Sequence, residues 1–382
     1  FTNENLVDFI LGFVIDSEKA FYADTTCGSG TFLIRIYDRL KYLSKKINHN
    51  QLLDRIWGFD IAKFPAELAT INLFRQDISN FENFPRVRRT DIFKVNKGDE
   101  YDFPPPSANK AFKKIKIKLP VYDAIVGNFP FIKQELIEKE IKGYKLYLTK
   151  VLAQDYFISY PKLFITTNVS QSNIEHLKKL TTEQFKKEIN RYVVKGFIEL
   201  KLSGQADIYT YIFIHTASLL ADKGQFAVIT SNSWLDVAYG SVLKEFFLDN
   251  FKVKAIIGSW AEPWFEDAAV NTIVTILEKE SNKSARDKNI TKFVKLKKKF
   301  AELIPYQDLK LESIKRWQTI ERLVDLIETS QDNSEILNTS ENINSLNLDE
   351  MRIRLIKQSI LLEEVRLNSE LSKWSPYLKA PD

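Results

Sequence analysis

A predicted strand, a glycine-containing turn and a predicted helix follow one another near the start of this chain. The apolar residues 20–23 predict a buried strand, and residues 32–40 have the apolar spacing of a helix. Glycine tolerates positive φ and lets a ligand approach the backbone closely. The order strand, turn, helix is half of a nucleotide-binding unit, so it favours an open α/β sheet. The turn between the two elements is Asp24-Thr25-Thr26-Cys27-Gly28-Ser29-Gly30-Thr31.

This turn matches neither of the common phosphate-binding patterns. The dinucleotide fingerprint needs G-x-G-x-x-G, whereas the turn holds Gly28 and Gly30 alone. A phosphate loop needs Gly-Lys-Ser/Thr, and that sequence does not follow here. The turn therefore favours a ligand without phosphates.

A second strand is predicted just before the tetrapeptide Asn128-Phe129-Pro130-Phe131. Residues 121–127 are a mostly apolar run, which places the tetrapeptide at the carboxyl end of a buried strand. Open α/β sheets bind their ligands at that end. An amide beside an aromatic ring suits a flat base that is stacked and hydrogen-bonded at once. Alone such a stretch is most often a simple turn, so its weight comes from its combination with the first motif.

Together the two motifs resemble those of adenine-specific DNA methyltransferases of the bacterial restriction-modification type. The family's first motif is close to Asp-Pro-Ala-Cys-Gly-Ser-Gly-Thr-Phe, and residues 24–32 match it except at Thr25 and Thr26. Its catalytic motif is Asn-Pro-Pro-Tyr or Asn-Pro-Pro-Phe, and residues 128–131 match it except at Phe129. The resemblance implies an α/β fold of the Rossmann-like class I methyltransferase type. We expect a mostly parallel twisted sheet with helices on both faces, followed by a C-terminal helical segment.

The resemblance also implies S-adenosylmethionine as the cofactor. Asp60 ends the predicted strand 55–61, where a carboxylate can accept both ribose hydroxyl hydrogens. In the family the equivalent of Asp91 binds the adenine amino group, with Ile92 or Phe93 on the ring. Thr2, Asp60 and Asp91 could each instead cap a helix or turn. The expected cofactor ligands are Thr2, Asp24, Thr25, Cys27, Gly28, Gly30, Thr31, Asp60, Ile61, Asp91, Ile92 and Asn128.

The catalytic motif implies roles for Asn128, Phe129, Pro130 and Phe131. The amino nitrogen of adenine is a poor nucleophile because its lone pair is delocalised into the ring. The Asn128 side-chain oxygen and the Phe129 carbonyl would accept its two hydrogens, and Phe131 would stack on the flipped base. The family has proline in place of Phe129, and proline restricts its own φ and the preceding residue. We therefore expect an activity that is retained but reduced.

Two other functions stay open at this stage. Protein glutamine methyltransferases also use Asn-Pro-Pro-Tyr, because a side-chain amide resembles the adenine amino group, although they are usually shorter. A degenerate, non-catalytic paralogue or subunit that binds cofactor or DNA would also be compatible with Phe129. Methyl transfer to DNA would separate these alternatives.

Composition limits the class of protein. The 382 residues carry a formal net charge of +5, which permits nucleic acid without demanding it. The one cysteine, Cys27, excludes an internal disulfide and fits the cytoplasm. Scattered histidines predict no metal site, and the lack of a long apolar run predicts no membrane span. The expected partner is double-stranded DNA with a flipped adenine, with a restriction or specificity subunit as an open addition.

The resemblance covers residues 1–281, which we expect to form the catalytic domain with insertions at about 96–119 and 132–200. The basic run 113–118 is either a solvated face or a DNA-phosphate contact. Residues 282–382 are predicted to be a mainly helical connector toward an absent target-recognition domain, with 330–347 flexible. His215 lies in a predicted buried helix and is assigned to the core. Residues 230–234 match the family's Thr-Ser-Asn-Ser-Trp, and residues 372–382 resemble the segment that leads into the recognition domain.

Overall fold

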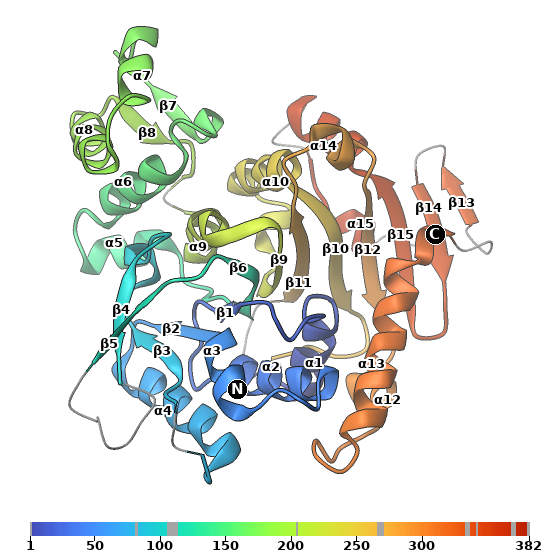
Figure 1. Ribbon diagram of the computed structural model, residues 1–382. Coiled ribbons are helices and arrows are strands. Elements are labelled where there is room, and N and C mark those ends of the chain that lie inside the picture. The colour runs from blue at the N-terminus through green and yellow to red at the C-terminus, as the bar shows by residue number, and fades with distance from the viewer. Residues whose placement is uncertain are drawn as a thin grey trace.

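An 11-stranded sheet runs through the centre of the protein (Figure 1). The structure is a computed structural model that describes residues 2–80, 83–104, 114–203, 205–265, 271–332, 337–340, 343–367 and 372–379. The strand order is β13-β14-β15-β12-β10-β11-β9-β6-β1-β2-β3. The strands are β1 Tyr22–Asp24, β2 Ile56–Asp60, β3 Arg86–Arg89, β6 Tyr122–Asn128, β9 Leu220–Ser231, β10 Phe251–Ser259, β11 Thr272–Lys279, β12 Ile290–Leu296, β13 Leu337–Ser340, β14 Ile343–Asn347 and β15 Met351–Lys357.

Most strands of this sheet point the same way. The neighbours β3, β2, β1, β6 and β9 pair in parallel, and so do β10 and β12. Strand β11 is antiparallel to both β9 and β10. Strands β15 and β13 are also reversed relative to their neighbours. The pairings therefore confirm the expected mostly parallel α/β sheet.

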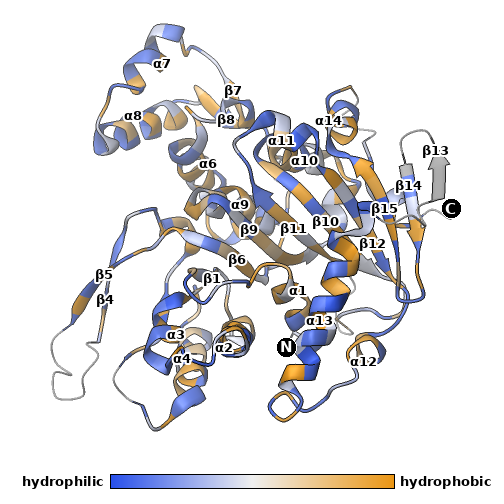
Figure 2. Ribbon diagram, turned by 45° about the vertical axis from the view of Figure 1, so that its right-hand side comes forward, coloured by the Kyte–Doolittle hydropathy of each residue, from blue (hydrophilic) through white to orange (hydrophobic). Residues whose placement is uncertain are grey.

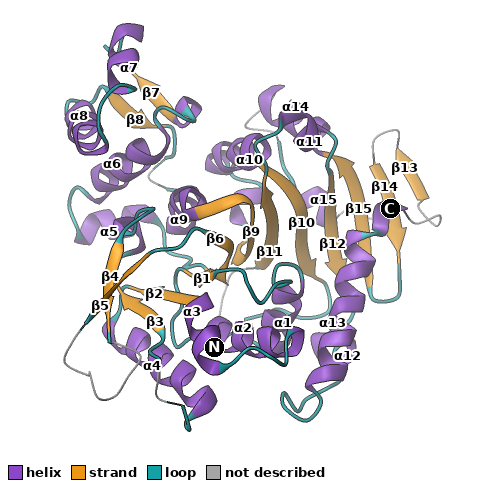
Figure 3. Ribbon diagram, viewed as in Figure 1, coloured by secondary structure: helices purple, strands orange, loops and turns teal. Residues whose placement is uncertain are grey.

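Helices cover both faces of the sheet because its strands are apolar on both sides (Figure 3). In β6, Ala124 and Val126 point into one core and Ile125 into the other, as the two-residue repeat of a strand requires. The first core is closed by α1 Glu4–Gly12, α2 Thr31–Leu43, α3 His49–Arg55, α4 Lys63–Phe74, α12 Phe300–Leu303 and α13 Ser313–Glu328. The second is closed by α6 Tyr144–Tyr156, α9 Ile208–Thr216, α10 Ala238–Asn250, α14 Gln358–Leu367 and α15 Ser375–Lys379.

The two predicted insertions have different structures. In the first, β4 Glu100–Phe103 and β5 Ile115–Lys118 form a two-stranded hairpin, and Lys113 of the basic run lies outside the described residues. The second is largely helical. It holds α5 Gln134–Glu140, α6, α7 Gln171–Leu177 and α8 Thr182–Val194, with a small pair of strands, β7 Phe164–Thr166 and β8 Ile198–Leu200. Figure 1 shows most of this insertion as a lobe beside the sheet.

The segment from residue 282 differs from the predicted helical connector. It does contain α11 Lys283–Asp287 and the long amphipathic helix α13, whose hydrophilic and hydrophobic residues are visible in Figure 2. However, β12, β14 and β15 extend the central sheet, and β13 and β14 lie within the stretch 330–347 that was expected to be flexible. Lysines and arginines in β12 and β15 interrupt the apolar pattern from which a buried strand is predicted. Their long aliphatic stems can nevertheless be buried while their charged groups reach polar partners. The segment thus contains five described helices together with strands that the expectation did not include.

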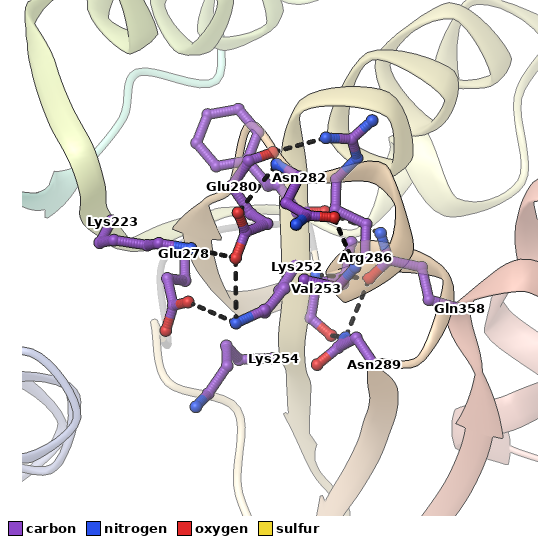
Figure 4. Close-up of polar contacts among 12 residues, drawn as sticks. Lys223, Lys252, Val253, Lys254, Glu278, Glu280, Asn282, Arg286, Asn289 and Gln358 are labelled. Atoms are coloured by element: carbon purple, nitrogen blue, oxygen red, sulfur yellow. Dashed lines mark hydrogen bonds and ion pairs between the residues drawn. The ribbon is translucent and has the colours of Figure 1, made fainter.

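Acidic residues neutralise the lysines where β9 and β10 begin (Figure 4). Lys252 of β10 pairs with Glu278 at 2.9 Å and with Glu280 at 3.3 Å. Lys223 of β9 also pairs with Glu280, and these hydrogen-bonded cations lower the Glu280 pKa to about 2. Lys223 and Lys252 are therefore each paired with a carboxylate.

None of the described helices is both long and apolar enough to cross a membrane.

Candidate cofactor and catalytic site

The carboxyl ends of β1, β2 and β6 lie at one edge of the sheet, because these strands are parallel neighbours. They end at Asp24, Asp60 and Asn128. A hollow of about 340 Å³, here called the strand-end hollow, opens beside them. Its lining residues are Thr2, Asp24, Thr26, Cys27, Gly28, Ser29, Thr31, Phe32 and Asn128. Six of the expected cofactor ligands thus lie together, namely Thr2, Asp24, Cys27, Gly28, Thr31 and Asn128.

The glycine turn is held against β2 by backbone hydrogen bonds. The Cys27 N–H donates to the Phe59 carbonyl at 2.8 Å, and the Gly30 N–H donates to the Cys27 carbonyl at 2.8 Å. Gly30 has φ +89°, and a Cβ there would lie 3.0 Å from the Cβ of Ala69 in α4. A larger residue would force the turn away from the helix, which explains why glycine precedes α2. Burial raises the pKa of the Cys27 thiol, so Cys27 is a small residue of the turn and not a reactive thiol.

Asp60 is fixed beside this turn. Its Oδ2 accepts a hydrogen bond from the Gly28 N–H at 2.9 Å, and its Oδ1 accepts one from the Ala62 N–H at 2.8 Å. Helix α4 has Ala62 as its N-cap, so Asp60 is not the cap of that helix. The neighbouring Ile61 is 69% exposed and does not line the hollow.

Asp24 lies at the base of the hollow and is 2% exposed. Its Oδ1 accepts a hydrogen bond from the Thr26 N–H at 3.0 Å. Burial, with a smaller contribution from the charge of Asp60, raises the Asp24 pKa from 3.8 to about 8. The sequence interpretation missed Gly127, whose φ is +151° and whose Cβ would lie 2.6 Å from the Asp24 Oδ1. In the sequence, the signal that could have identified Gly127 is its position between an apolar run and Asn128.

Asn128 presents an unused hydrogen-bond acceptor. Its Oδ1 is buried and accepts no hydrogen bond from any described residue. Its backbone carbonyl accepts a hydrogen bond from the Thr26 hydroxyl at 3.3 Å, which joins the catalytic motif to the glycine turn. Thr26 was not among the expected ligands. The Thr25 hydroxyl oxygen is likewise buried without a described partner, although Thr25 does not line the hollow. Such buried polar atoms are uncommon and mark places where a ligand can bind.

Phe129 points into the core and away from the hollow. It is 1% exposed, and its ring packs edge-on against Phe213 of α9 with centroids 5.1 Å apart. Its N–H donates to the Ile229 carbonyl of β9 at 3.0 Å. Pro130 and Phe131 are partly buried, and Phe131 packs against both hydrophobic cores. Phe129, which stands where the family has proline, is therefore accommodated because its ring packs against Phe213 in the core.

Asp91 and Ile92 lie outside the strand-end hollow. Asp91 caps the 3-10 turn η2 (Ile92–Lys94), because its Oδ1 accepts a hydrogen bond from the Phe93 N–H at 3.0 Å. Its Oδ2 accepts one from the Tyr147 hydroxyl of α6 at 3.2 Å. Ile92 is 6% exposed and belongs to the core. The capping alternative for Asp91 is thus realised, and sequence reasoning missed its contact with Tyr147.

Thr2 is available to the hollow because another residue caps α1. The Asn3 side chain accepts a hydrogen bond from the Asn5 N–H at 2.8 Å, which makes Asn3 the cap. Thr2 and Thr31 also line a larger neighbouring hollow of about 910 Å³. The loop after β10 closes that hollow with Trp264 and Phe265. The two hollows therefore meet at Thr2 and Thr31.

His215 is a core residue, as the sequence predicted. It is fully buried, and its Nδ1 lies 2.7 Å from the Asp155 Oδ2 of α6. Its Nε2 lies 3.0 Å from the carbonyl oxygens of both Ile92 and Val95. Carboxylate and carbonyl oxygens only accept hydrogen bonds, so both ring nitrogens must donate and the ring is an imidazolium. Burial opposes this charge, but Asp155 and the two carbonyls outweigh it and raise the His215 pKa above 6.5.

Two family models match this chain, one after the other. The N-6 DNA Methylase model matches residues 1–156, and the Eco57I restriction-modification methylase model matches residues 180–265. The Type II methyltransferase M.BstVI of Geobacillus stearothermophilus is 25% identical over 166 residues. That alignment covers 43% of this chain and 20% of the relative, so the chain spans about a fifth of that protein's length. Over residues 1–156 and 180–265 the chain therefore resembles adenine-specific (N-6) DNA methyltransferases of restriction-modification systems.

Solved structures share the fold. A chain of a type I restriction-modification system matches with a TM-score of 0.56 and 14% identity, covering 100% of this chain and 60% of that one. The type IIG restriction endonuclease BpuSI matches with a TM-score of 0.55 and 14% identity, covering 97% and 32%. The M protein of the type I restriction enzyme EcoKI matches with a TM-score of 0.50 and 13% identity, covering 100% and 67%. These matches agree with the class I methyltransferase fold.

Proposed function

We propose that this chain transfers a methyl group from S-adenosylmethionine to the exocyclic 6-amino group of adenine in DNA. The observation that carries the proposal is the buried Asn128 Oδ1, which accepts no hydrogen bond from a described residue. It lies at the rim of the strand-end hollow, where an amino group could supply the missing donor. In the adenine-specific methyltransferases that the chain resembles, this acceptor acts on adenine.

The residues in and beside the strand-end hollow suit S-adenosylmethionine. Asp60 offers carboxylate lone pairs to a ribose beside the Gly28 N–H, and Gly127 leaves the space that a side chain would fill. Asp24 supplies a carboxyl group that a cationic ligand would ionise. Asp91, Ile92 and Ile61 are proposed as the adenine-side ligands, although they lie outside the hollow. When bound, the cofactor supplies an electrophilic methyl group on a sulfonium.

The chain's own residues would activate the nucleophile and hold it in place. The Asn128 Oδ1 and the Phe129 carbonyl accept hydrogen bonds from the amino group, which returns electron density to nitrogen. Phe131 stacks on the base and offsets part of an unstacking cost of about a few kcal/mol. The anchored Phe129 fixes the backbone between these groups, so positioning supplies much of the rate.

We further propose double-stranded DNA with a flipped adenine as the substrate and a methyltransferase role in a restriction-modification or phage-defence system. A restriction or specificity subunit is the proposed protein partner, since a similar fold occurs in a type I restriction-modification system. The reducing cytoplasm, where its DNA would lie, is the proposed location.

Calorimetric titration with S-adenosylmethionine tests the cofactor assignment. We expect binding by the wild type and at least about a tenfold weaker affinity for Asp60→Ala, because a charged acceptor contributes about 1.5–3 kcal/mol. The control is Asp102→Ala, an exposed acid of the β4–β5 hairpin, which should bind like the wild type. Absence of binding by the wild type would overturn the proposal.

A further inference from the structure

A buried histidine holds the turn that carries two of the proposed adenine-side ligands. Asp91 caps the turn η2, and Ile92 is the first residue of this turn. The Thr90 N–H donates to the Asp60 carbonyl at 2.8 Å, so Asp91 follows directly after a residue that is bonded to the end of β2. The turn therefore lies at the carboxyl edge of the sheet, beside the carboxylate proposed for the ribose.

His215 of α9 contacts both ends of this turn. Its Nε2 lies 3.0 Å from the Ile92 carbonyl oxygen and 3.0 Å from the Val95 carbonyl oxygen. The Val95 N–H also donates to the Ile92 carbonyl at 3.0 Å, and the Phe93 ring lies with its centroid 5.6 Å from that of the imidazole. Carbonyl oxygens only accept hydrogen bonds and would repel a lone pair at Nε2, so this contact requires a proton at that nitrogen.

The other ring nitrogen of His215 is bonded to α6. Its Nδ1 lies 2.7 Å from the Asp155 Oδ2. A neutral imidazole has a single N–H, whereas a carboxylate only accepts. The bond to the carboxylate is the shorter and the charge-assisted one, so the neutral ring keeps its proton at Nδ1. Loss of one proton from His215 therefore removes the donor to η2 and leaves the bond to α6 in place.

The surroundings of His215 make this ring the group that changes charge here. Burial lowers its pKa, but Asp155 and the two carbonyls outweigh burial and raise the pKa above 6.5. Among the described residues Asp155 is the one charged group that shifts this pKa. The groups that η2 presents to the ring are two backbone carbonyls and Phe93, and none of them titrates.

Asp91 is oriented from the same two sides. The Phe93 N–H donates to its Oδ1 at 3.0 Å, and the Tyr147 hydroxyl of α6 donates to its Oδ2 at 3.2 Å. A carboxylate has about four positions for donors, so these two bonds fix its plane and leave positions for an amino group. Asp91 is partly exposed, whereas His215 behind it is fully buried.

We propose that His215 is a positioning residue for the adenine end of the cofactor. This inference rests on the proposed function, because it takes Asp91 and Ile92 as adenine-side ligands. With both ring nitrogens protonated, His215 holds η2 in the shape that presents the Asp91 carboxylate at the sheet edge. Without the proton at Nε2 the turn loses its donor, and the adenine is bound less tightly. The imidazole itself does not touch the cofactor.

The test is the pH dependence of binding of 5′-deoxy-5′-methylthioadenosine. This neutral nucleoside keeps the adenine and the ribose of the cofactor but lacks its charged end, so the charge of Asp24 has little influence on it. Calorimetry is carried out over the pH range in which the ring protons of His215 show it to titrate. We expect the affinity of the wild type to fall about tenfold as His215 loses its proton.

The same coupling has a reciprocal readout that a purely structural histidine would not show. If the protonated form binds about tenfold more tightly, saturation with the nucleoside should raise the His215 pKa by about 1 in a proton NMR titration. His49, whose Nδ1 lies 2.8 Å from the Tyr37 hydroxyl in the other core, is the internal control. Its titration should be the same with and without the nucleoside.

Asp155→Asn is the conservative variant that should rescue binding at high pH. The asparagine amide can donate to Nδ1, so the neutral ring can keep its one N–H at Nε2 for the two carbonyls. We expect an affinity that no longer changes with pH and equals that of the wild type at low pH. The matched control is Asp249→Asn, because the side chains of Asp249 and Asp155 are both 12% exposed and both paired. This control should keep the wild-type pH dependence.

Three results would each overturn the inference. They are a wild-type affinity that stays constant while His215 titrates, a His215 pKa that the nucleoside does not change, and a pH dependence that persists in folded Asp155→Asn. Thermal melts show which proteins are folded at each pH, and the NMR readout needs only the wild type. Binding without methyl transfer would contradict the proposed catalysis alone, whereas a wild type that binds no nucleoside at any pH would remove the cofactor site and this inference with it.

Discussion

Asp24 links the protonation of one buried carboxyl group to the stability of the fold. Its pKa is about 8 in the folded protein and 3.8 in the ordinary environment of an unfolded chain. Between these two pKa values the folded state keeps the proton and the unfolded state does not. The contribution of Asp24 to the free energy of unfolding is therefore complete below pH 4 and is lost as the pH rises to about 8. Relative to Asp24→Asn, we expect the ligand-free wild type to lose about 1.4 kcal/mol per pH unit in this window.

Urea unfolding of both proteins at pH 5 and pH 7 measures this difference. The comparison between wild type and Asp24→Asn cancels the titration of all other groups. A difference that does not change with pH would mean that Asp24 is ionised in the folded protein. A cationic ligand should weaken the pH dependence, because it would stabilise the carboxylate.

The packing of Phe129 changes the expectation that the missing proline of the catalytic motif limits activity. The sequence alone indicated that the lost proline limits activity. Yet proline at this position would remove both the hydrogen bond to Ile229 and the ring that packs against Phe213. We expect Phe129→Pro to lower the free energy of unfolding by about 3 kcal/mol or more and to reduce activity.

Phe129→Leu is the matched control, since it keeps the N–H and most of the apolar volume and should cost about 1 kcal/mol. Chemical denaturation and methyl-transfer assays on both variants are the measurements. A stable Phe129→Pro protein with higher activity than the wild type would show that the position limits the rate.

At the residue scale, the sequence predicted those site residues whose chemistry is local. Asp24, Gly28 and Asn128 follow directly from a strand end and a turn, and the structure brings them to one hollow. Thr26, Gly127 and Tyr147 were missed because their importance depends on contacts between separate elements. The Gly127 constraint, for example, is set by a carboxylate more than 100 positions earlier in the chain.

At the scale of elements, His215 joins α9, α6 and η2 through a buried charge. Asp155, the carbonyls of Ile92 and Val95 and the ring of Phe93 are the groups that face it. Because the folded-state pKa is raised, its contribution to stability is complete below pH 6.5 and is lost as the pH rises through the higher folded value. His215→Gln should therefore destabilise the protein more at pH 6 than at pH 9.

Proton NMR of the histidine ring protons tests the same point without unfolding. The chain has three histidines, so the signals can be assigned with one variant each. We expect His215 to titrate above 6.5 and His49, whose pKa burial lowers, to titrate below it. A His215 signal that titrates below 6.5 would contradict the imidazolium assignment.

Apolar runs made several strands predictable, whereas charged strands were not. The runs that became β1, β2 and β6 are buried on both faces and are mainly apolar. By contrast, β15 carries Arg352 and Arg354, which are buried because they donate to the carbonyls of Leu378 and Pro376 in α15. No local sequence pattern indicates that these carbonyls are the partners of the two arginines, so the segment that forms β15 was assigned to a connector.

At the scale of the whole molecule, a buried ion cluster ties the C-terminal segment to the N-terminal helix. Asp8 of α1 is fully buried and lies 2.6 Å from the Arg35 Nε of α2 and 2.5 Å from the Arg316 Nε of α13. Arg316 also donates to the Tyr306 carbonyl at 2.8 Å. The segment after residue 281 thus takes part in the core that supports the site.

Arg316→Met should destabilise the whole protein by about 3 kcal/mol, because it breaks a buried pair. The control is Arg322→Met on the same helix, whose exposed pair with Glu350 at 3.6 Å should contribute less than about 1 kcal/mol. Thermal unfolding followed by far-ultraviolet circular dichroism and tryptophan fluorescence gives both values. If Arg316→Met left the main transition unchanged, residues 282–382 would be an independent unit.

The central claim is methyl transfer to adenine, and one assay tests it most directly. Wild type and Asn128→Ala are incubated with unmethylated genomic DNA and S-adenosylmethionine carrying a labelled methyl group, and the DNA is digested to nucleosides. We predict label in 6-methyladenine for the wild type and loss of at least about 100-fold for Asn128→Ala. Cofactor binding without labelled adenine in the wild type, or label in protein instead of DNA, would contradict the account.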